Sequence, residues 1–276
     1  MEHPIVATNA TLTYGDRTLW RNLNFDLPAG SFLAVLGPNG SGKTSLLRSL
    51  LGLQALSSGT LSILGASPRK GNPHIGYIPQ QRGFDRDLPI RGRDLVSLGL
   101  NGHRFGWHRF SLHDRIALDT VIAAVGAERY ADSPIGLLSG GEQQRLRVAQ
   151  AILGSPELLL CDEPLLSLDI AHQHEIVRLI NAQRKEQNAT IVFVTHEINP
   201  ILPYVDLVLY FANGQWKLGT PDDIFQDEVL TELFHTDVHV IRDGGRIAIV
   251  SQQSDINDEA GGHHQHGTPS EREADK

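Results

Sequence analysis

The sequence predicts an α/β fold in which a mostly parallel sheet carries helices on its faces. Two short runs of β-forming residues, 158–161 and 190–195, flank a segment with the composition of a helix, 172–187. A third apolar run, 31–36, ends in a glycine-rich loop and is followed by apolar residues at helical spacing over 43–53. Strands that alternate with helices in this way are typical of parallel sheets buried on both faces.

The strands nearest the N-terminus have a different pattern. Residues 5–12 and 19–27 alternate between apolar and polar side chains, with a turn at 15–16 between them. This alternation predicts an N-terminal antiparallel β subdomain. Residues 59–64 and 75–78 are further strand candidates.

The middle of the chain is mostly helical. From residue 88 onwards the apolar spacing is that of helices, with an interruption over 99–110 by residues rich in Gly, His and Arg. We interpret about 85–153 as a helical subdomain inserted into the α/β domain. Residues 206–250 predict small strands and helices that close the domain.

Length and composition predict one domain over residues 1–250 and a tail over 251–276. The tail has almost no apolar residues and is expected to be disordered. The net charge of −8 argues against a nucleic-acid partner. The single cysteine, Cys161, fits a reducing compartment, and there is neither a run of about 18 apolar residues nor a secretory signal pattern. These features predict a cytoplasmic protein.

Residues 37–44 form a glycine-rich loop with the pattern G-x-x-x-x-G-K-[ST] between a predicted strand and a predicted helix. The glycines allow the backbone to wrap a phosphate group with its N–H groups inward, and the helix N-terminus adds a favourable dipole. Lys43 is expected to pair with the β- and γ-phosphates of a nucleotide, and Thr44 to place its hydroxyl on Mg²⁺. A turn that binds nothing is the alternative, which the strand–loop–helix context makes rare. The loop residues are Gly37, Pro38, Asn39, Gly40, Ser41, Gly42, Lys43 and Thr44.

Two carboxylates, Asp162 and Glu163, follow the apolar run 158–161. A buried strand has no reason to end in paired acids unless a positive or protic group lies there. Asp162 is suited to hold Mg²⁺, directly or through one of its ligands, and Glu163 to polarise a water that attacks the γ-phosphate. A solvated strand end is the alternative. Cys161, inside the strand, is interpreted as a small buried hydrophobic residue.

Residues 138–145 read Leu-Ser-Gly-Gly-Glu-Gln-Gln-Arg. Ser139, Gly140 and Gly141 open a predicted helix, whose N-terminus offers a hydroxyl and free N–H groups to an anion. A Ser-Gly-Gly alone is an ordinary helix cap, but the octapeptide is highly specific. Since the chain already has a phosphate loop, a second anion site makes sense if it caps a nucleotide bound elsewhere.

With these motifs in this order, the chain resembles the ATP-binding subunit of an ABC transporter over about residues 5–225. The resemblance implies a P-loop NTPase of the ABC cassette type, with ATP and Mg²⁺ as cofactors and ATP hydrolysis coupled to transmembrane transport. It also implies a head-to-tail dimer of two copies with two ATPs at the interface. In that dimer the residues of one copy that cap the ATP of the other are Ser139, Gly140, Gly141 and Glu142.

The same resemblance implies roles for four more residues. Tyr14 matches the aromatic residue that stacks on adenine. Gln80 matches the glutamine that contacts Mg²⁺ and the attacking water and that opens the segment docking on the membrane subunit. Asp169, in the Ser-Leu-Asp run, matches a loop that crosses the dimer interface, and His196 matches a histidine that contacts the γ-phosphate. The implied catalytic residues are Glu163, His196 and Gln80, and the implied Mg²⁺-binding residues are Thr44, Gln80 and Asp162.

The implied partners are integral membrane permease subunits and, through them, an extracytoplasmic substrate-binding protein. The implied location is peripheral, at the cytoplasmic face of the membrane. Residues 84–90, 94–99 and 106–107 are similar to cassettes of the manganese, zinc or iron importers. Import of an iron-siderophore, haem or cobalamin, or export, remains the alternative. A soluble non-transport ABC ATPase fits less well, because the chain has neither tandem cassettes nor a long coiled-coil insertion.

Histidines give two further expectations about metal. His263, His264 and His266 in the tail are expected either to bind Zn²⁺, Ni²⁺ or Cu²⁺ weakly or to belong to a solvated polar tail, and both interpretations stay open. His235 and His239 are expected in an extended segment that spreads them, which makes a metal site there improbable. The histidines of the helical subdomain are interpreted as surface residues: His103, His108 and His113.

Overall fold

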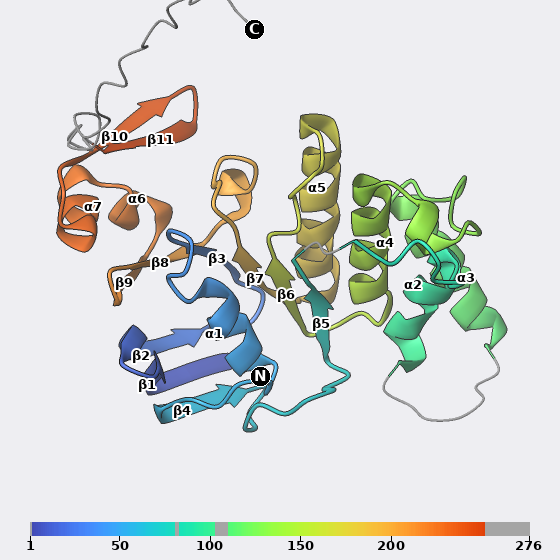
Figure 1. Cartoon of the computed structure of the whole chain (residues 1–276), viewed down its shortest axis with the longest axis horizontal. Helices are drawn as coiled ribbons and strands as arrows, with labels where there is room; N and C mark the ends of the chain where they lie inside the picture. Colours follow the sequence, from blue (N-terminus) through green and yellow to red (C-terminus); the bar gives the residue numbers. More distant parts are fainter. Residues whose placement is uncertain (1, 81–82, 103–109, 252–276) are drawn as a thin grey trace, which may run out of the picture.

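The computed structural model describes residues 2–80, 83–102 and 110–251. Within these residues the strands form three sheets, of which the largest is six-stranded with the order β5-β6-β7-β3-β8-β9 (Figure 1). Its strands are β3 (Phe32–Leu36), β5 (Ile75–Ile78), β6 (Leu158–Asp162), β7 (Thr190–Val194), β8 (Leu207–Ala212) and β9 (Gln215–Gly219). All neighbours pair in parallel except β8 and β9, which are antiparallel. The predicted α/β fold with a mostly parallel core sheet is confirmed.

The continuous apolar sequence of β3 follows from burial on both faces. Leu33 and Val35 belong to one hydrophobic cluster, while Phe32, Ala34 and Leu36 belong to a second cluster across the sheet. Successive side chains of a strand point to opposite faces, so both faces of this strand must be apolar. The sheet thus separates two hydrophobic cores and contributes side chains to both.

The first core lies between the large sheet and an antiparallel sheet with the order β2-β1-β4. Its strands are β1 (Ile5–Tyr14), β2 (Arg17–Leu27) and β4 (Ser58–Ile63), and α1 (Lys43–Leu50) packs between the two sheets (Figure 1). The predicted N-terminal antiparallel subdomain is therefore confirmed.

Helix α1 ends three residues earlier than the apolar spacing predicts. Gly52 has a φ of 67°, and its N–H donates to the Ser49 carbonyl, while the Leu53 N–H donates to the Arg48 carbonyl. This pair of bonds is the Schellman motif that closes many helices. Leu53 therefore continues the apolar spacing without continuing the helix.

The second core joins the other face of the large sheet to the helices. Three of them, α2 (Gly92–Asn101), α3 (Leu112–Ala124) and α4 (Gly140–Leu153), pack together at one end of the sheet, next to α5 (Ile170–Gln187) (Figure 1). The sequence places an interruption at residue 99, whereas α2 continues to Asn101. His103 and His108 lie outside the described residues.

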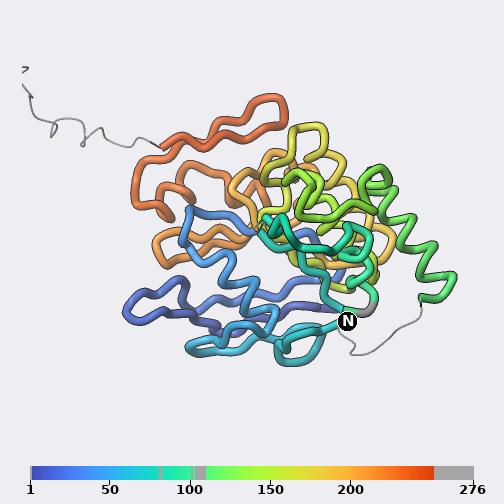
Figure 2. Tube along the Cα trace, turned by 45° about the vertical axis from the view of Figure 1, so that its right-hand side comes forward, coloured from blue at the N-terminus to red at the C-terminus, as the bar shows by residue number. Residues whose placement is uncertain are grey.

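The C-terminal elements lie on the side of the large sheet opposite the antiparallel sheet (Figure 2). They are α6 (Pro221–Ile224), α7 (Asp227–Phe234) and a hairpin of β10 (Val238–Asp243) and β11 (Arg246–Ser251). Ser251 pairs with Val238, so the hairpin includes the first residue that we assigned to the tail. Residues 252–276, with His263, His264 and His266, lie outside the described part of the chain.

Candidate nucleotide-binding site

The phosphate loop, residues 37–44, connects β3 to α1 and depends on glycine at two tight positions. Gly37 has a φ of 141°, and a Cβ there would meet the Phe211 carbonyl oxygen at 2.2 Å. Gly42 has a φ of 102°, and a Cβ there would lie 2.8 Å from the Trp20 ring. Side-chain-bearing residues rarely adopt these φ values. The loop therefore needs glycine for its path as well as for access of a phosphate to its N–H groups.

Lys43 is the first residue of α1, and its side chain is buried under this loop. Its Nζ donates to the carbonyl oxygens of Gly37 at 2.6 Å and Pro38 at 3.0 Å. Burial lowers the pKa of the Lys43 ammonium below its ordinary value, while the charges of Glu163 and Asp162 raise it. A phosphate bound by the loop would place a further negative charge near the Lys43 ammonium and would favour its charged form.

Asp162 is buried at the end of β6, where it accepts a hydrogen bond of 3.1 Å from the Thr44 hydroxyl to its Oδ1. Burial raises the pKa of Asp162 above its usual value and the charge of Glu163 raises it further, whereas the Thr44 hydrogen bond and Lys43 lower it. A buried carboxylate beside a hydroxyl is a set of hard oxygen donors. The residues present therefore fit Mg²⁺.

Glu163 follows directly after Asp162 and is the meeting point of three strand ends. Its Oε2 accepts from Gln80 Nε2 at 3.0 Å, two residues beyond β5, and its Oε1 lies 3.8 Å from His196 Nδ1, two residues beyond β7. The Glu163 side chain is 13% exposed and that of His196 is 59% exposed. Because β5, β6 and β7 are parallel, their carboxyl ends meet at one edge of the sheet. Sequence-distant Gln80, Glu163 and His196 therefore converge.

Ser139 caps the N-terminus of α4. Its Oγ accepts from the Glu142 N–H at 3.4 Å, and Glu142 Oε2 accepts from the Ser139 N–H and hydroxyl, both at 2.8 Å. This is a capping box. Gly140 and Gly141 are the first two residues of the helix, where backbone N–H groups have no partner within the helix. None of these hydrogen bonds between described residues links Ser139 to the phosphate loop.

Two other residues from the sequence analysis also lie at element ends. Asp169 caps α5, accepting from the His172 N–H at 3.0 Å, and these contacts with His172 hold the pKa of Asp169 below its usual range. Tyr14 ends β1, and its hydroxyl donates to Gln54 Oε1. Half of the Tyr14 residue, 51%, is exposed, which leaves ring surface available for stacking.

Sequence reasoning missed one cation beside the phosphate loop. Arg17 follows the turn between β1 and β2, and its Nη2 donates to the Gly40 carbonyl oxygen at 2.9 Å. A lone arginine after a hairpin turn carries no sequence signal, because only the packing of the two sheets brings it to the loop. Cys161, by contrast, is buried as expected, and burial raises its thiol pKa well above the ordinary value.

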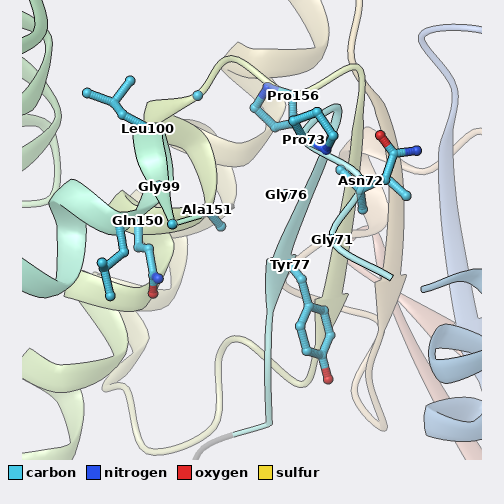
Figure 3. A pocket seen from close by; sticks show the side chains of 14 residues that line it. Gly71, Asn72, Pro73, Gly76, Tyr77, Gly99, Leu100, Gln150, Ala151 and Pro156 are labelled. Carbon is cyan, nitrogen blue, oxygen red and sulfur yellow. The ribbon is translucent and has the colours of Figure 1, made fainter. Parts of the chain in front are cut away.

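A second surface feature is a groove of about 410 Å³ between β5 and the ends of α2 and α4 (Figure 3). Tyr77 of β5 lines one side, and Gly99 of α2 with Gln150 and Ala151 of α4 lines the other. It also includes Leu98, a large apolar side chain that is half exposed. None of the nucleotide-site residues described above lines this groove.

The remaining side chains that the structure describes offer little to a metal ion. In the described part of the chain, no three His, Cys, Asp or Glu residues are grouped to hold an ion. His235 is the residue after α7, and His239 lies in β10, where its Nδ1 is 3.0 Å from Asp227 Oδ2. Across residues 2–80, 83–102 and 110–251, no helix is long and apolar enough to cross a bilayer.

A phosphate loop, a buried carboxylate and a glutamate held at the strand ends together define a nucleotide-binding ATPase domain. Residues 20–166 match the family model described as ABC transporter. The chain belongs to the ABC transporter family and is its ATP-binding ATPase component.

Three relatives show how far the similarity extends. The iron(3+)-hydroxamate import ATP-binding protein FhuC of Bacillus subtilis is 31% identical over 83% of this chain and 87% of its own. The manganese transport system ATP-binding protein MntB of the same species is 29% identical over 91% of this chain and 96% of its own. The zinc import ATP-binding protein ZnuC of Pseudomonas savastanoi pv. phaseolicola is 32% identical over 81% of this chain and 78% of its own.

Two solved structures are similar in fold and sequence. A structure assigned to a metal-chelate type ABC transporter, in an inward-facing conformation, is 28% identical with a TM-score of 0.75, covering 91% of this chain and 98% of the other. A dimeric structure of the ATP-binding cassette MJ0796, in a post-hydrolysis state with ADP and Pi, is 26% identical with a TM-score of 0.67, covering 78% of this chain and 98% of the other.

Proposed function

We propose that this chain hydrolyses ATP as a head-to-tail dimer and thereby energises import of a transition-metal ion, manganese, zinc or iron, through a separate membrane permease. The observation that carries the proposal is the convergence of Gln80, Glu163 and His196 beside Lys43 and the Asp162–Thr44 pair. Hydrolysis of a triphosphate needs a cation for the phosphates and a base for water, and these side chains supply both kinds of group.

Each residue of the site has a distinct part in the proposed hydrolysis. Lys43 and the loop N–H groups bind the β- and γ-phosphates. Thr44, Asp162 and Gln80 would hold Mg²⁺, which neutralises charge on the phosphates when it is bound. Glu163 accepts the proton of the attacking water, and Gln80 and His196 hold that water and the γ-phosphate in line.

The dimer follows from where the second anion site lies. The free N–H groups of Gly140 and Gly141 begin α4, and Ser139 makes no hydrogen bond to the phosphate loop among the described residues. Large apolar side chains beside this helix start and beside Asp169 are exposed, Leu137 at 68% and Ile170 at 74%. We infer that a second copy covers them and that Ser139, Gly140, Gly141 and Glu142 cap its ATP, with Asp169 at the interface.

The groove beside β5 is the proposed contact with the permease. It lies next to the strand that leads to Gln80, and Leu98 offers apolar surface to a short helix of the membrane subunit. A permease seated there would move the Gln80 segment when the dimer closes and reopens. The assembly would place this chain at the cytoplasmic face of the membrane, with an extracytoplasmic substrate-binding protein delivering the ion and with no nucleic acid involved.

The proposed cargo is chosen from the sequence similarity of this chain to named transport proteins. The names of the relatives include manganese transport and zinc import, at 29% and 32% identity. The import of an iron-hydroxamate, which is an iron-siderophore, is the second candidate, favoured by the 31% identity to FhuC. The two candidates differ in whether a bare ion or a chelate crosses the membrane.

Copurification of the permease and reconstitution of the complex in liposomes test the cargo. With the partner subunits and binding protein present, we expect Mn²⁺, Zn²⁺ or iron ions to stimulate ATP hydrolysis and to enter the vesicles. Stimulation by a ferric hydroxamate and by none of the bare ions would favour the second candidate. A complex that ignores all of them would contradict both.

A further inference from the structure

Gln144 is a buried side chain on α4 that reaches the chain segment carrying Glu163. It is 0% exposed, and its Nε2 donates to the Pro164 carbonyl oxygen at 3.1 Å. Pro164 is the residue directly after Glu163, so the bond holds the backbone immediately beyond that carboxylate. It joins the helix that starts at Ser139 to the loop that follows β6.

The backbone at this point is strained. Glu163 has a φ of 49°, in the left-handed region that residues other than glycine seldom adopt. Such conformations persist only where surrounding contacts enforce them. On one side the Glu163 N–H donates to the Val194 carbonyl at 3.0 Å, and on the other the Pro164 carbonyl accepts from Gln144. These two bonds bracket the strained residue.

The amide of Gln144 has a cost that an apolar side chain would avoid. Its Oε1 is buried, and no described group donates a hydrogen bond to it. A buried acceptor without a donor destabilises a fold, whereas an apolar side chain of the same shape would not. The side chain of Gln144 nevertheless carries an amide, and the Nε2 of that amide donates to the Pro164 carbonyl oxygen. This points to a role for that one hydrogen bond.

The same helix also holds the segment that follows Gln80. Gln143 Oε1 accepts from the Phe84 N–H at 3.4 Å, and the Arg147 guanidinium lies 4.5 Å from the centre of the Phe84 ring. Helix α4 therefore contacts the chain on both sides of the Gln80–Glu163 hydrogen bond.

We propose that Gln144 is a positioning residue that holds Glu163 in its strained conformation from α4. This inference rests on the proposed role of Glu163 as the base that accepts the proton of water. Because α4 begins with the residues that cap the ATP of the second copy, a displacement of α4 also displaces the base. The placement of the base thus depends on the placement of the capping residues within one chain.

Gln144→Met removes the donor and keeps the length of the side chain. We expect kcat for ATP hydrolysis to fall at least tenfold and KM for ATP to change less than twofold, because the phosphate loop is untouched. Gln226→Met is the control: Gln226 also donates to a carbonyl, that of Asp222 at 2.9 Å, but it is exposed and lies between α6 and α7. The kcat of this variant should equal that of the unmodified chain. An unchanged kcat in Gln144→Met would overturn the proposal.

A double variant separates positioning from general loss of structure. In a Glu163→Gln background, Gln144→Met should change the residual hydrolysis less than twofold, because its effect acts through the missing carboxylate. A further tenfold fall in that background would overturn the proposal. If Gln144→Met fails to fold, Gln144→Asn serves, since it keeps an amide but withdraws it by one methylene, and the same comparison applies.

The outcomes also distinguish this inference from the function on which it rests. If Glu163→Gln alone keeps full kcat, the base assignment is wrong and the inference falls with it. If Glu163→Gln abolishes turnover while Gln144→Met does not lower it, the proposed function stands and only the inference fails.

Discussion

At the residue scale, the site is built from side chains in unfavourable states. Lys43 and Asp162 are charged groups that burial disfavours, and Glu163 has a left-handed backbone. Groups in such states persist at functional sites because the surrounding structure enforces them. A substitution at such a residue is therefore expected to change the stability of the fold and the activity of the site by different amounts.

Glu163→Gln should abolish turnover and leave ATP binding intact. The amide keeps the shape and the contact distance to Gln80 but cannot accept a proton from water, so kcat should fall by about 100-fold or more. Steady-state hydrolysis and nucleotide binding by the purified protein measure the two effects. Glu186→Gln, an exposed glutamate near the end of α5, is the control with unchanged kcat. A normal kcat in Glu163→Gln would refute the assignment of the base.

Asp162→Asn should stabilise the nucleotide-free protein and weaken binding of Mg²⁺ with ATP. Burial raises the pKa of Asp162, so its charged form destabilises the fold at pH values above that pKa. We expect the melting temperature at pH 7 to rise, because the neutral amide removes the cost of burying a charge at this position. The gain should shrink as the pH falls through the raised pKa, because the aspartic acid then becomes neutral. A gain that grows on acidification would contradict this assignment.

At the element scale, the same local signal marks two helices with different roles. Ser139 with Glu142 caps α4, and Ser111 with Asp114 caps α3 through an identical set of contacts. The capping box explains why both helices begin where they do. Only the start of α4, with its two glycines and exposed apolar neighbours, is proposed to contact a nucleotide.

Ser139→Ala and Ser111→Ala therefore form a matched pair. Each should cost about 1 kcal/mol of stability, measured by thermal or denaturant unfolding, because each removes a helix cap. Only Ser139→Ala should also lower ATP hydrolysis, by at least about tenfold. Equal rates in the two variants would show that Ser139 serves α4 alone.

Local motifs explain how much of the site the sequence predicts. The phosphate loop is recognisable because its path needs glycine at fixed positions such as Gly37 and Gly42. Glu163 is recognisable because it comes directly after an apolar strand that ends in Asp162. Gln144 and Arg17 are not, because their partners, Pro164 and Gly40, are brought to them only by tertiary packing.

The fold was predictable to a similar extent. Apolar runs and alternation located β3, β5, β6 and β7 to within a residue at each end. The predicted helix ends were less accurate, because capping contacts decide where a helix begins and ends. The Schellman bonds end α1 before Leu53, and the Asp169 cap starts α5 at Ile170, two residues before His172. Apolar spacing carries no information on such contacts.

At the scale of the whole molecule, each proposed ATP site takes residues from two chains. The phosphate loop and Glu163 lie at the ends of the parallel strands, whereas Ser139 starts a helix whose cap bonds do not reach that loop. If hydrolysis needs both the phosphate loop with Glu163 and the helix start at Ser139, a chain that lacks either one cannot complete a site with a copy of itself. Two variants with different defects should therefore complement each other when they are mixed.

Mixing Lys43→Ala with Ser139→Ala chains is the most direct measurement. Each variant alone should hydrolyse ATP at a small fraction of the normal rate. In an equal mixture, half of the dimers are mixed and each has one intact site, so the rate should recover to about a quarter of normal. A mixture that stays as inactive as its components would show that both halves act within one chain, and would contradict the shared site.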